Sequence, residues 1–312
     1  MSSDTGAPAT VDDVLAALAA HDYLADEGLA TAVFLALRLQ RPLLLEGEAG
    51  VGKTEVAKVL ARWTGGELVR LQCYEGIDST QALYEWDHAR QLLHLRAAEA
   101  TGAATTAGST VATEALEDEL YAERFLIRRP LLRAISAPTT APPPVLLIDE
   151  IDRADDEFEA FLLELLSDWS VTVPELGTVT AVVPPVAVLT SNRTRDVHDA
   201  LKRRCLYHWV EQPDFEREVA IVAVRAPEVG AVLGRQVAAA VAGVRTLGLY
   251  KPPGIAETID WAKALAALGR REIDERSVDA TLGVVVKYRE DQQRVRSSGV
   301  GDLVRDALRR GA

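Results

Sequence analysis

Two kinds of hydrophobic pattern alternate along most of the chain. Short apolar runs such as PLLLE, VLLIDE and PVAVLTSN are typical of strands buried on both faces of a parallel sheet. Between them, apolar residues recur at the spacing of an amphipathic helix. One such stripe, in the segment after VLLIDE, consists of Phe158, Phe161, Leu162, Leu165 and Trp169. Strands that alternate with helices over about residues 1–210 predict an α/β fold with a parallel sheet.

The pattern is not the same along the whole chain. After PDFEREVA the strand signals nearly vanish, and residues 213–290 predict about four amphipathic helices. We therefore expect a core over residues 1–211 and a helical domain over 212–312 that ends in a C-terminal helix. Residues 97–115 contain almost no large apolar side chain, which predicts a flexible insertion in the core. DSTQALYEWDHARQLLHLRA predicts one helix, and VTVPELGTVTAVV a hairpin.

Composition narrows the function. The formal net charge is −13, which argues against broad attraction to nucleic acid or anionic membranes. No apolar run approaches the roughly 18 residues of a membrane-spanning helix, and the N-terminus lacks the pattern of a signal peptide. Cys73 and Cys205 belong to no metal or redox spacing. We expect a cytoplasmic protein without structural disulfides.

A glycine-rich segment, GEAGVGKT, fits the pattern G-x-x-x-x-G-K-S/T. Glycines let backbone N–H groups surround phosphate oxygens, a lysine reaches the terminal phosphates, and a threonine hydroxyl binds Mg²⁺. The alternative is an ordinary turn, but the position between an apolar strand and a helix favours a nucleotide site. The predicted loop consists of Gly47, Glu48, Ala49, Gly50, Val51, Gly52, Lys53 and Thr54.

Polar residues follow two of the predicted strands. Asp149 at the end of VLLIDE is suited, with Thr54, to hold Mg²⁺, and Glu150 to orient or deprotonate the attacking water. Alternatively, both carboxylates only begin the next helix, where acids are favoured. Asn192, at the end of VAVLTSN, is suited to hold the water or the γ-phosphate, and it could also be a helix cap.

These motifs together resemble a known family. GEAGVGKT, LLIDEIDRA, LTSN and LKRRC occur in the order found in AAA+ ATPases. The hairpin before LTSN and the wording GEAGVGKTEVAK are similar to the MoxR branch. LQCYEGIDSTQALYEWDHARQLLHLRA and DALKRRCLYHWV resemble its members encoded with carbon-monoxide-dehydrogenase maturation proteins. The resemblance covers about residues 20 to 290.

The resemblance implies an AAA+ P-loop core, with a parallel sheet flanked by helices, followed by a small all-helical lid. It implies a homo-oligomer, usually a ring of six, that binds ATP and Mg²⁺ between neighbouring subunits. Hydrolysis would drive the remodelling or maturation of a client metalloenzyme, together with a partner that contains a von Willebrand A domain. The resemblance points to a molybdenum-containing carbon-monoxide dehydrogenase as the client.

A basic cluster, KRR, lies near residue 203 of this acidic chain. The resemblance assigns the arginine finger, which enters the neighbouring subunit's pocket, to Arg204, with Arg203 second and Lys202 as a solvated charge. Two other interpretations are open. The cluster could be cations that suit the end of a helix, or a nucleic-acid patch.

The chain departs from the family in its lid. Family members commonly carry a lid arginine that touches the γ-phosphate, whereas Thr258 occupies the matching position here. Lys263, or a residue from a neighbouring subunit, could replace it. Family analogy also places Tyr23 and Leu24 at the adenine, although packing in the core is an equally good explanation.

Two clusters and two other functions stay open. Tyr74, Tyr84 and Trp86 could be core or partner interface. The alternatives for one arginine-rich segment are a subunit interface or a solvated helix face, and its members are Arg124, Arg128, Arg129 and Arg133. The chain could also be a nucleic-acid-associated motor or loader, against which the acidic balance argues. A nucleotide-binding switch with little turnover is the remaining alternative.

Overall fold

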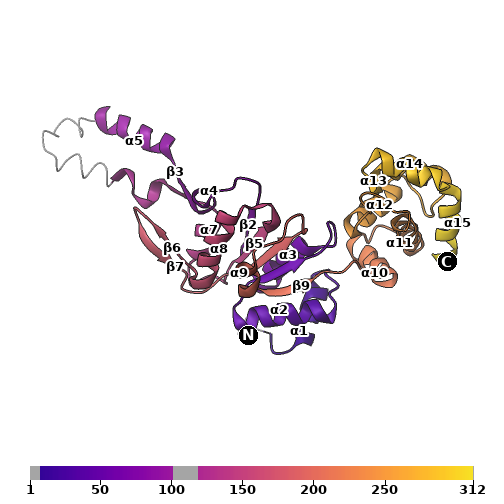
Figure 1. Cartoon of the computed structure of the whole chain (residues 1–312), viewed down its shortest axis with the longest axis horizontal. Helices are drawn as coiled ribbons and strands as arrows, with labels where there is room; N and C mark the ends of the chain where they lie inside the picture. Colours follow the sequence, from indigo (N-terminus) through magenta and orange to yellow (C-terminus); the bar gives the residue numbers. More distant parts are fainter. Residues whose placement is uncertain (1–7, 101–118, 312) are drawn as a thin grey trace. The chain divides into compact units, whose positions relative to one another are not determined.

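A computed structural model describes residues 8–100 and 119–311 (Figure 1). Residues 101–115 of the predicted flexible insertion therefore lie outside the described residues, whereas residues 97–100 form the end of a helix. None of the helices in these two ranges is both long and apolar enough to cross a bilayer.

A five-stranded sheet with the order β2-β5-β8-β1-β9 forms the centre of the α/β fold (Figure 1). β2 pairs with β5, and β5 with β8, in parallel. Every residue of β1 and β5 is buried, as the apolar runs predict. The predicted fold class is confirmed. The strands are β1 (Leu43–Glu46), β2 (Leu68–Gln72), β5 (Val145–Asp149), β8 (Val186–Ser191) and β9 (Leu206–Trp209).

Helices accompany the strands in the βα order that the sequence predicts. α8 begins behind the cap Asp155, whose side chain accepts a hydrogen bond from the Phe158 N–H. The predicted stripe of α8 is buried at Phe158, Leu162 and Leu165, in one core with apolar residues of β5 and β8. The helices of this part are α1 (Val11–Ala20), α2 (Glu27–Leu39), α3 (Lys53–Thr64), α7 (Pro130–Ile135), η2 (Ile151–Arg153), α8 (Asp156–Asp168) and α9 (Asp199–Arg204).

The segment predicted as one helix from Asp78 is instead divided, so this prediction was wrong. It forms α4 (Ser79–Leu83), β3 (Tyr84–Trp86) and α5 (His88–Ala100). β3 pairs in antiparallel fashion with β4 (Leu126–Arg128), which follows η1 (Glu123–Phe125). Backbone pairing with a distant strand thus overrides the local helical pattern.

The predicted hairpin is present. β6 (Ser170–Val173) and β7 (Gly177–Thr180) are antiparallel, and Gly177 adopts a φ of 78° at the turn. A glycine is suited to this position because side chains rarely tolerate positive φ.

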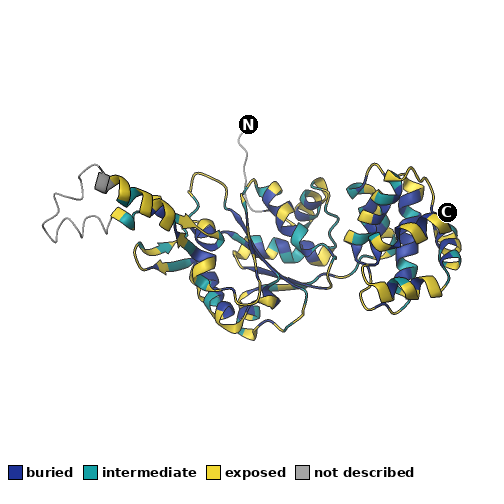
Figure 2. Ribbon diagram, turned by 90° about the horizontal axis from the view of Figure 1, so that it is seen from above, coloured by how far each residue is buried: buried dark blue, intermediate teal, exposed yellow. Residues whose placement is uncertain are grey.

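The C-terminal region consists of helices, and its buried residues face inward (Figure 2). Trp261 is completely buried there, and its Nε1–H donates a hydrogen bond of 2.7 Å to Thr281 Oγ1. The four expected helices are followed by two more. They are α10 (Phe215–Arg225), α11 (Ala231–Arg245), α12 (Ile255–Ala267), α13 (Glu275–Val285), α14 (Arg289–Ser297) and α15 (Val300–Arg310).

The chain falls into two compact units that interleave along the sequence. Unit 1 comprises Met1–Phe34, Leu45–Trp63 and Tyr207–Ala312, and unit 2 comprises Leu35–Leu44 and Thr64–Leu206. The phosphate loop and the helices α10–α15 therefore belong to unit 1, and the acidic pair belongs to unit 2. The boundary between residues 211 and 212 stays a prediction.

Candidate active site

The phosphate loop connects β1 to α3, which begins at Lys53. Gly50 and Gly52 adopt φ angles of 81° and 96°, in a region that L side chains rarely enter. A Cβ atom at Gly47 would lie 2.5 Å from the Val210 carbonyl oxygen, so this position has no room for a side chain. The three glycines therefore allow a backbone path that other residues would block.

Lys53 is buried, and its ammonium group is held by the loop itself. Nζ donates to the carbonyl oxygens of Gly47 (2.8 Å) and Glu48 (2.7 Å). The half-buried Thr54 follows in the first turn of α3, where N–H groups have no intrahelical partners. Backbone N–H groups, the N-terminus of a helix, a lysine and a hydroxyl are the donor set that a nucleotide phosphate with Mg²⁺ requires, so the residues fit this ligand.

The N-terminus of α12 contacts the same loop within unit 1. Ala256 N–H donates a hydrogen bond of 3.3 Å to the Gly50 carbonyl oxygen. Glu257 Oε2 accepts a hydrogen bond of 3.0 Å from Gly254 N–H. The same oxygen would lie 3.0 Å from a Cβ atom if Gly50 were replaced by a larger residue. A side chain at Gly50 would therefore press against this end of α12.

Thr258, at which the resemblance predicts a departure from a lid arginine, is completely buried inside the helical region. Its hydroxyl lies 2.6 Å from Glu218 Oε1 and 3.1 Å from the Gly254 carbonyl oxygen. Arg245 binds the Glu218 carboxylate through two nitrogens, at 2.6 and 2.9 Å, and donates to the Pro253 carbonyl oxygen at 2.7 Å. This network fixes the turn that precedes α12. Lys263 is exposed.

Tyr23 lies beside the loop at Gly52, and Leu24 follows it in the chain. The Tyr23 ring is 3.8 Å from the position of a Gly52 Cβ atom, and burial raises the pKa of its hydroxyl. The Arg217 guanidinium donates to the Leu24 carbonyl oxygen at 2.8 Å and to Asp26 Oδ2 at 3.0 Å. Whether these residues contact adenine stays a prediction.

Glu55 follows Thr54 and connects α3 to α10. Its Oε1 accepts a hydrogen bond of 2.9 Å from Arg225, and its Oε2 accepts one of 3.1 Å from Lys58. Burial acts to raise the pKa of Glu55, but the hydrogen bonds from these two cations outweigh it, so the pKa lies below its ordinary value. Glu55 is therefore an anionic anchor beside the phosphate loop.

In unit 2, both oxygens of the buried Asp149 carboxylate have partners. Oδ1 accepts a hydrogen bond of 2.5 Å from the Thr190 hydroxyl, and Oδ2 accepts one of 2.6 Å from Arg70. The Thr190 oxygen in turn accepts from the Glu150 N–H at 3.0 Å. Thr190 thus links the ends of β5 and β8, and it fixes Asp149 and Glu150 together.

Glu150 has a left-handed backbone, with a φ of 56°. Such a conformation costs a non-glycine residue of the order of 1 kcal/mol or more, and it is found preferentially at functional sites. The carboxylate contacts Arg153 at 2.9 Å, Gln72 at 3.1 Å and the Asn192 amide at 3.4 Å. The structure therefore brings Glu150 and Asn192 together.

Asn192 is not the cap of the following helix. α9 begins only at Asp199, and its N-cap is His198. The backbone N–H groups of Asn192 and Thr194 bind the buried Asp152 carboxylate at 3.2 and 2.9 Å. The loop after β8 is thus fixed by Asp152, and the Asn192 side chain turns toward Glu150.

The KRR cluster forms the last turn of α9. The side chains of Arg203 and Arg204 are exposed, and neither has an ion pair or hydrogen bond with any described residue. The backbone carbonyl oxygens of both residues bind Arg41 at 2.7 and 3.1 Å. Both charges are therefore uncompensated within the described residues, and they also suit the helix dipole.

Residues 42–205 match the AAA domain (dynein-related subfamily). The chain belongs to this family. Its AAA domain thus begins just before β1 and ends directly after α9. The family match covers the phosphate loop, the acidic pair, Asn192 and the KRR cluster.

Solved structures similar to this AAA protein include forms of Thermotoga maritima RuvB. An alanine-to-serine mutant has 15% identity and a TM-score of 0.48, and the alignment covers 98% of this chain and 89% of that chain. The RuvB Holliday junction branch migration motor has 15% identity, a TM-score of 0.46 and coverages of 91% and 84%. A proline-to-glycine mutant has 14% identity, a TM-score of 0.47 and coverages of 97% and 87%. A comparison with curated proteins found no match.

In contrast to Arg203 and Arg204, the four arginines of the 124–133 segment all have carboxylate partners. The ion pairs join Arg124 to Glu119, Arg128 to Glu123, Arg129 to Glu85, and Arg133 to Glu67. Both members of every pair are largely exposed, so these residues form a solvated and locally neutralised surface of the AAA domain.

The predicted aromatic cluster is only partly correct. Trp86 is buried and contacts the rings of Tyr84 and Tyr121 edge-on, with centroid distances of 6.3 and 5.3 Å. Tyr74 is exposed and binds Gln81 instead. Tyr84 and Trp86 therefore pack with each other, and Tyr121 is a member that the sequence did not indicate.

Several residues of the site were missed by sequence reasoning. Arg70 and Gln72 come from β2, and Arg217 and Arg225 from α10, and none of these positions carries a recognisable motif. Thr190 could have been found, because it belongs to the quoted LTSN segment and directly precedes Ser191 and Asn192.

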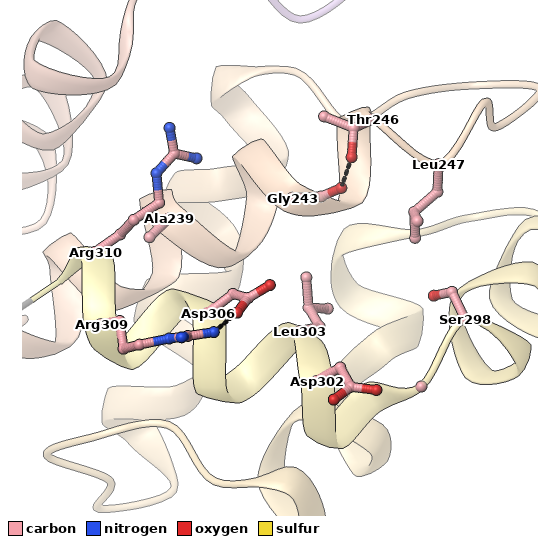
Figure 3. Close-up of a pocket in the computed structure, with 11 residues that line it drawn as sticks. Ala239, Gly243, Thr246, Leu247, Ser298, Asp302, Leu303, Asp306, Arg309 and Arg310 are labelled. Atoms are coloured by element: carbon pink, nitrogen blue, oxygen red, sulfur yellow. Dashed lines mark hydrogen bonds and ion pairs between the residues drawn. The ribbon is translucent and has the colours of Figure 1, made fainter.

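A separate cavity of about 490 Å³ lies among the C-terminal helices (Figure 3). Leu303 and Ala239 line it, and Asp306 on its wall is paired with Arg309. None of the residues assigned to the nucleotide site lines this cavity.

Proposed function

We propose that this AAA protein is a MoxR-type ATPase that converts ATP and water to ADP and phosphate. Members of the family are nucleotide-hydrolysing ATPases in general, and the phosphate loop provides the donors that ATP with Mg²⁺ requires. The observation that carries the proposal is the strained Glu150, which follows Asp149 directly and contacts the Asn192 amide.

Each residue then has a defined task. The loop N–H groups and Lys53 bind the phosphates, and Thr54 and Asp149 hold Mg²⁺. When bound, Mg²⁺ neutralises charge that develops on the phosphoryl oxygens. Glu150 accepts a proton from the attacking water, and Asn192 orients that water. The Arg153, Gln72 and Asn192 contacts hold the Glu150 carboxylate at the end of β5.

The transferred phosphoryl group also needs a cation on its far side. We assign this task to Arg204 of a neighbouring subunit, with Arg203 as its second. Their exposure and their lack of partners support the assignment, because a finger must be free to enter another pocket. The proposal requires a homo-oligomer with heterologous contacts, which a ring of six satisfies.

The client and the partner are the finer part of the proposal. GEAGVGKTEVAK and the hairpin β6–β7 before LTSN support a MoxR assignment. We propose on this basis that the ATPase acts with a von Willebrand A-domain protein on a metalloenzyme, such as a molybdenum-containing carbon-monoxide dehydrogenase. Thr258 binds Glu218 within the helical region. Closure of this lid would therefore be coupled to the phosphate loop through the contact between Gly50 and the N-terminus of α12.

A subunit-mixing assay tests the hydrolytic mechanism. Arg204→Ala keeps an intact pocket but lacks the finger, whereas Glu150→Gln keeps the finger but lacks the base. Each variant alone should be nearly inactive. In an equal mixture, about a quarter of the interfaces combine an intact pocket with an intact finger, so activity should return to that fraction.

Three other results would contradict parts of the proposal. Normal hydrolysis by Arg204→Ala would remove the finger assignment. Tight ATP binding without turnover in the wild-type protein, with the partner present, would indicate a nucleotide switch. A mobility shift with single-stranded or duplex DNA that depends on ATP would instead favour a nucleic-acid motor or loader.

A further inference from the structure

The C-terminal end of α9 is held by a residue that is distant in sequence. The Arg41 guanidinium donates hydrogen bonds to three consecutive carbonyl oxygens, those of Arg203 (2.7 Å), Arg204 (3.1 Å) and Cys205 (3.4 Å). A second anchor joins the same two segments, because Leu206 N–H donates to the Pro42 carbonyl oxygen at 2.8 Å. All of these residues belong to unit 2.

These bonds matter because α9 is short. It has six residues, and the last four carbonyl groups of any helix lack intrahelical partners. A helix of this length is not stable by itself in water. A planar guanidinium can bind several carbonyl oxygens at once, and a cation at this end also suits the helix dipole. Arg41 therefore fixes where α9 ends and which way its last turn faces.

The chemistry of this anchor is selective. A carboxylate at the same place would form ion pairs with Arg203 and Arg204 and neutralise them, as happens to all four arginines of the 124–133 segment. Among the residues that the structure describes, Arg41 instead binds only backbone carbonyl groups, and it adds a further positive charge. It thus orders the last turn while it leaves both side chains uncompensated and exposed.

We propose that Arg41 is the positioning residue of the arginine finger. It directs Arg204 and Arg203 away from their own subunit, so that they reach a neighbour's pocket in one fixed geometry. Arg41 and Pro42 directly precede β1, which leads into the phosphate loop, so the same stretch of chain carries the subunit's own loop and the anchor of its finger. The inference rests on the proposed function of Arg204.

The test uses the full chain with Arg41→Ala, Arg41→Lys, Arg204→Ala and a matched control, Arg133→Ala, which loses an exposed ion pair elsewhere in the same unit. Arg41→Ala should lower kcat about 100-fold, since a misplacement of about 1 Å can have this effect. Its KM for ATP, its melting temperature and its oligomeric state should change little. Arg41→Lys should recover only part of the rate. It keeps the positive charge, but an ammonium group cannot bind three carbonyl groups in the same plane. Arg133→Ala should behave like the wild type.

Complementation separates positioning from a general structural defect. An equal mixture of Arg41→Ala with Glu150→Gln should regain activity, because the Glu150→Gln subunits supply well-placed fingers to intact pockets. Activity that does not return, or loss of the oligomer in both Arg41 variants, would overturn the inference. So would a normal rate for Arg41→Ala while Arg204→Ala is inactive. A normal rate for both variants would instead show that the proposed role of Arg204 is wrong.

Discussion

The chain contains two arginine clusters that look equivalent in the sequence and differ in the structure. The arginines of the 124–133 segment each face a carboxylate, and every one of those pairs is exposed. Arg203 and Arg204, at the end of α9, face no carboxylate among the described residues, and their last turn is held by Arg41 through the backbone alone. The difference lies in what surrounds each charge rather than in the number of charges.

This comparison shows how a positive cluster can be interpreted. A charge that is already paired within its own subunit has little left to offer to a ligand or a neighbour, whereas an ordered and unpaired charge can act on another molecule. An ion pair usually both orders an arginine side chain and neutralises its charge. At the end of α9, Arg41 orders the last turn without neutralising Arg203 or Arg204.

The largest effect is expected at the unpaired cluster. Arg204→Ala should lower kcat about 1,000-fold, in the range that removal of an arginine finger produces. Arg203→Ala should have a smaller effect, because Arg203 is the second residue of the pair. Steady-state ATPase rates measure both. The comparison fails if Arg129→Ala, a member of the paired cluster, lowers the rate as much as Arg204→Ala does.

A paired arginine should matter for stability when its partner is buried. Arg245→Ala leaves the Glu218 carboxylate, which is only 1% exposed, without its bidentate cation. An uncompensated buried charge should lower the free energy of unfolding by about 3 kcal/mol. Urea unfolding measures the change. Arg235→Ala is the matched control, since Arg235 joins the same two helices through the exposed Glu216. Equal losses for both variants would show that burial of the partner is not the cause.

The ion pair between Arg225 and Glu55 is partly buried, and its contribution to stability should depend on pH. The hydrogen bonds from Arg225 and Lys58 outweigh burial and lower the pKa of Glu55 in the folded protein below its ordinary value of 4.5. The folded state therefore gains stability from Glu55 above that value, and it loses this gain as pH falls through the lower folded pKa. Arg225→Ala should be less stable than the wild type near neutral pH, and the difference should shrink in acid. Melting temperatures of Arg225→Ala and the wild type, measured near neutral pH and in acid below the folded pKa of Glu55, check this. A difference between the two proteins that grows in acid would contradict it.

The smallest effects are expected in the 124–133 segment. Exposed ion pairs contribute about 0.5 kcal/mol or less, so Arg129→Ala and Arg133→Ala should each change the free energy of unfolding by no more than this. Their ATPase rates should equal that of the wild type. A large loss of either quantity would mean that this cluster has a partner beyond the carboxylates of its own subunit.

Local patterns were predictable from the sequence. The phosphate loop lies within eight consecutive residues, and Gly50 and Gly52 are suited to it by their own positive φ angles. The buried strands β1 and β5, the stripe of α8 and the hairpin β6–β7 also follow from short windows of sequence. The identities of Asp149 and Glu150 were available for the same reason, although the left-handed backbone of Glu150 was not.

Contacts between distant segments could not be predicted in this way. β3 interrupts an expected helix because it pairs with β4. In this pairing Trp86 lies opposite Leu126, which is 40 residues further along the chain. Arg41, Arg70 and Arg217 act through partners in other elements, and no local pattern distinguishes them from solvated arginines. The sequence singled out Thr258 only through the resemblance, and the structure alone shows that its hydroxyl binds Glu218.

The interleaving of the two units has a consequence for the way the protein is made. The phosphate loop emerges early from the ribosome, but Val210, which lies against Gly47, and Gly254, which lies against Gly50, belong to the last third of the chain. At about 5 to 20 residues per second, the roughly 200 residues between the phosphate loop and Gly254 take about 10 to 40 s to add. A nascent chain should therefore carry a complete phosphate-loop sequence well before it has a complete nucleotide site, so that ATP can stabilise only a polypeptide that already extends beyond Gly254.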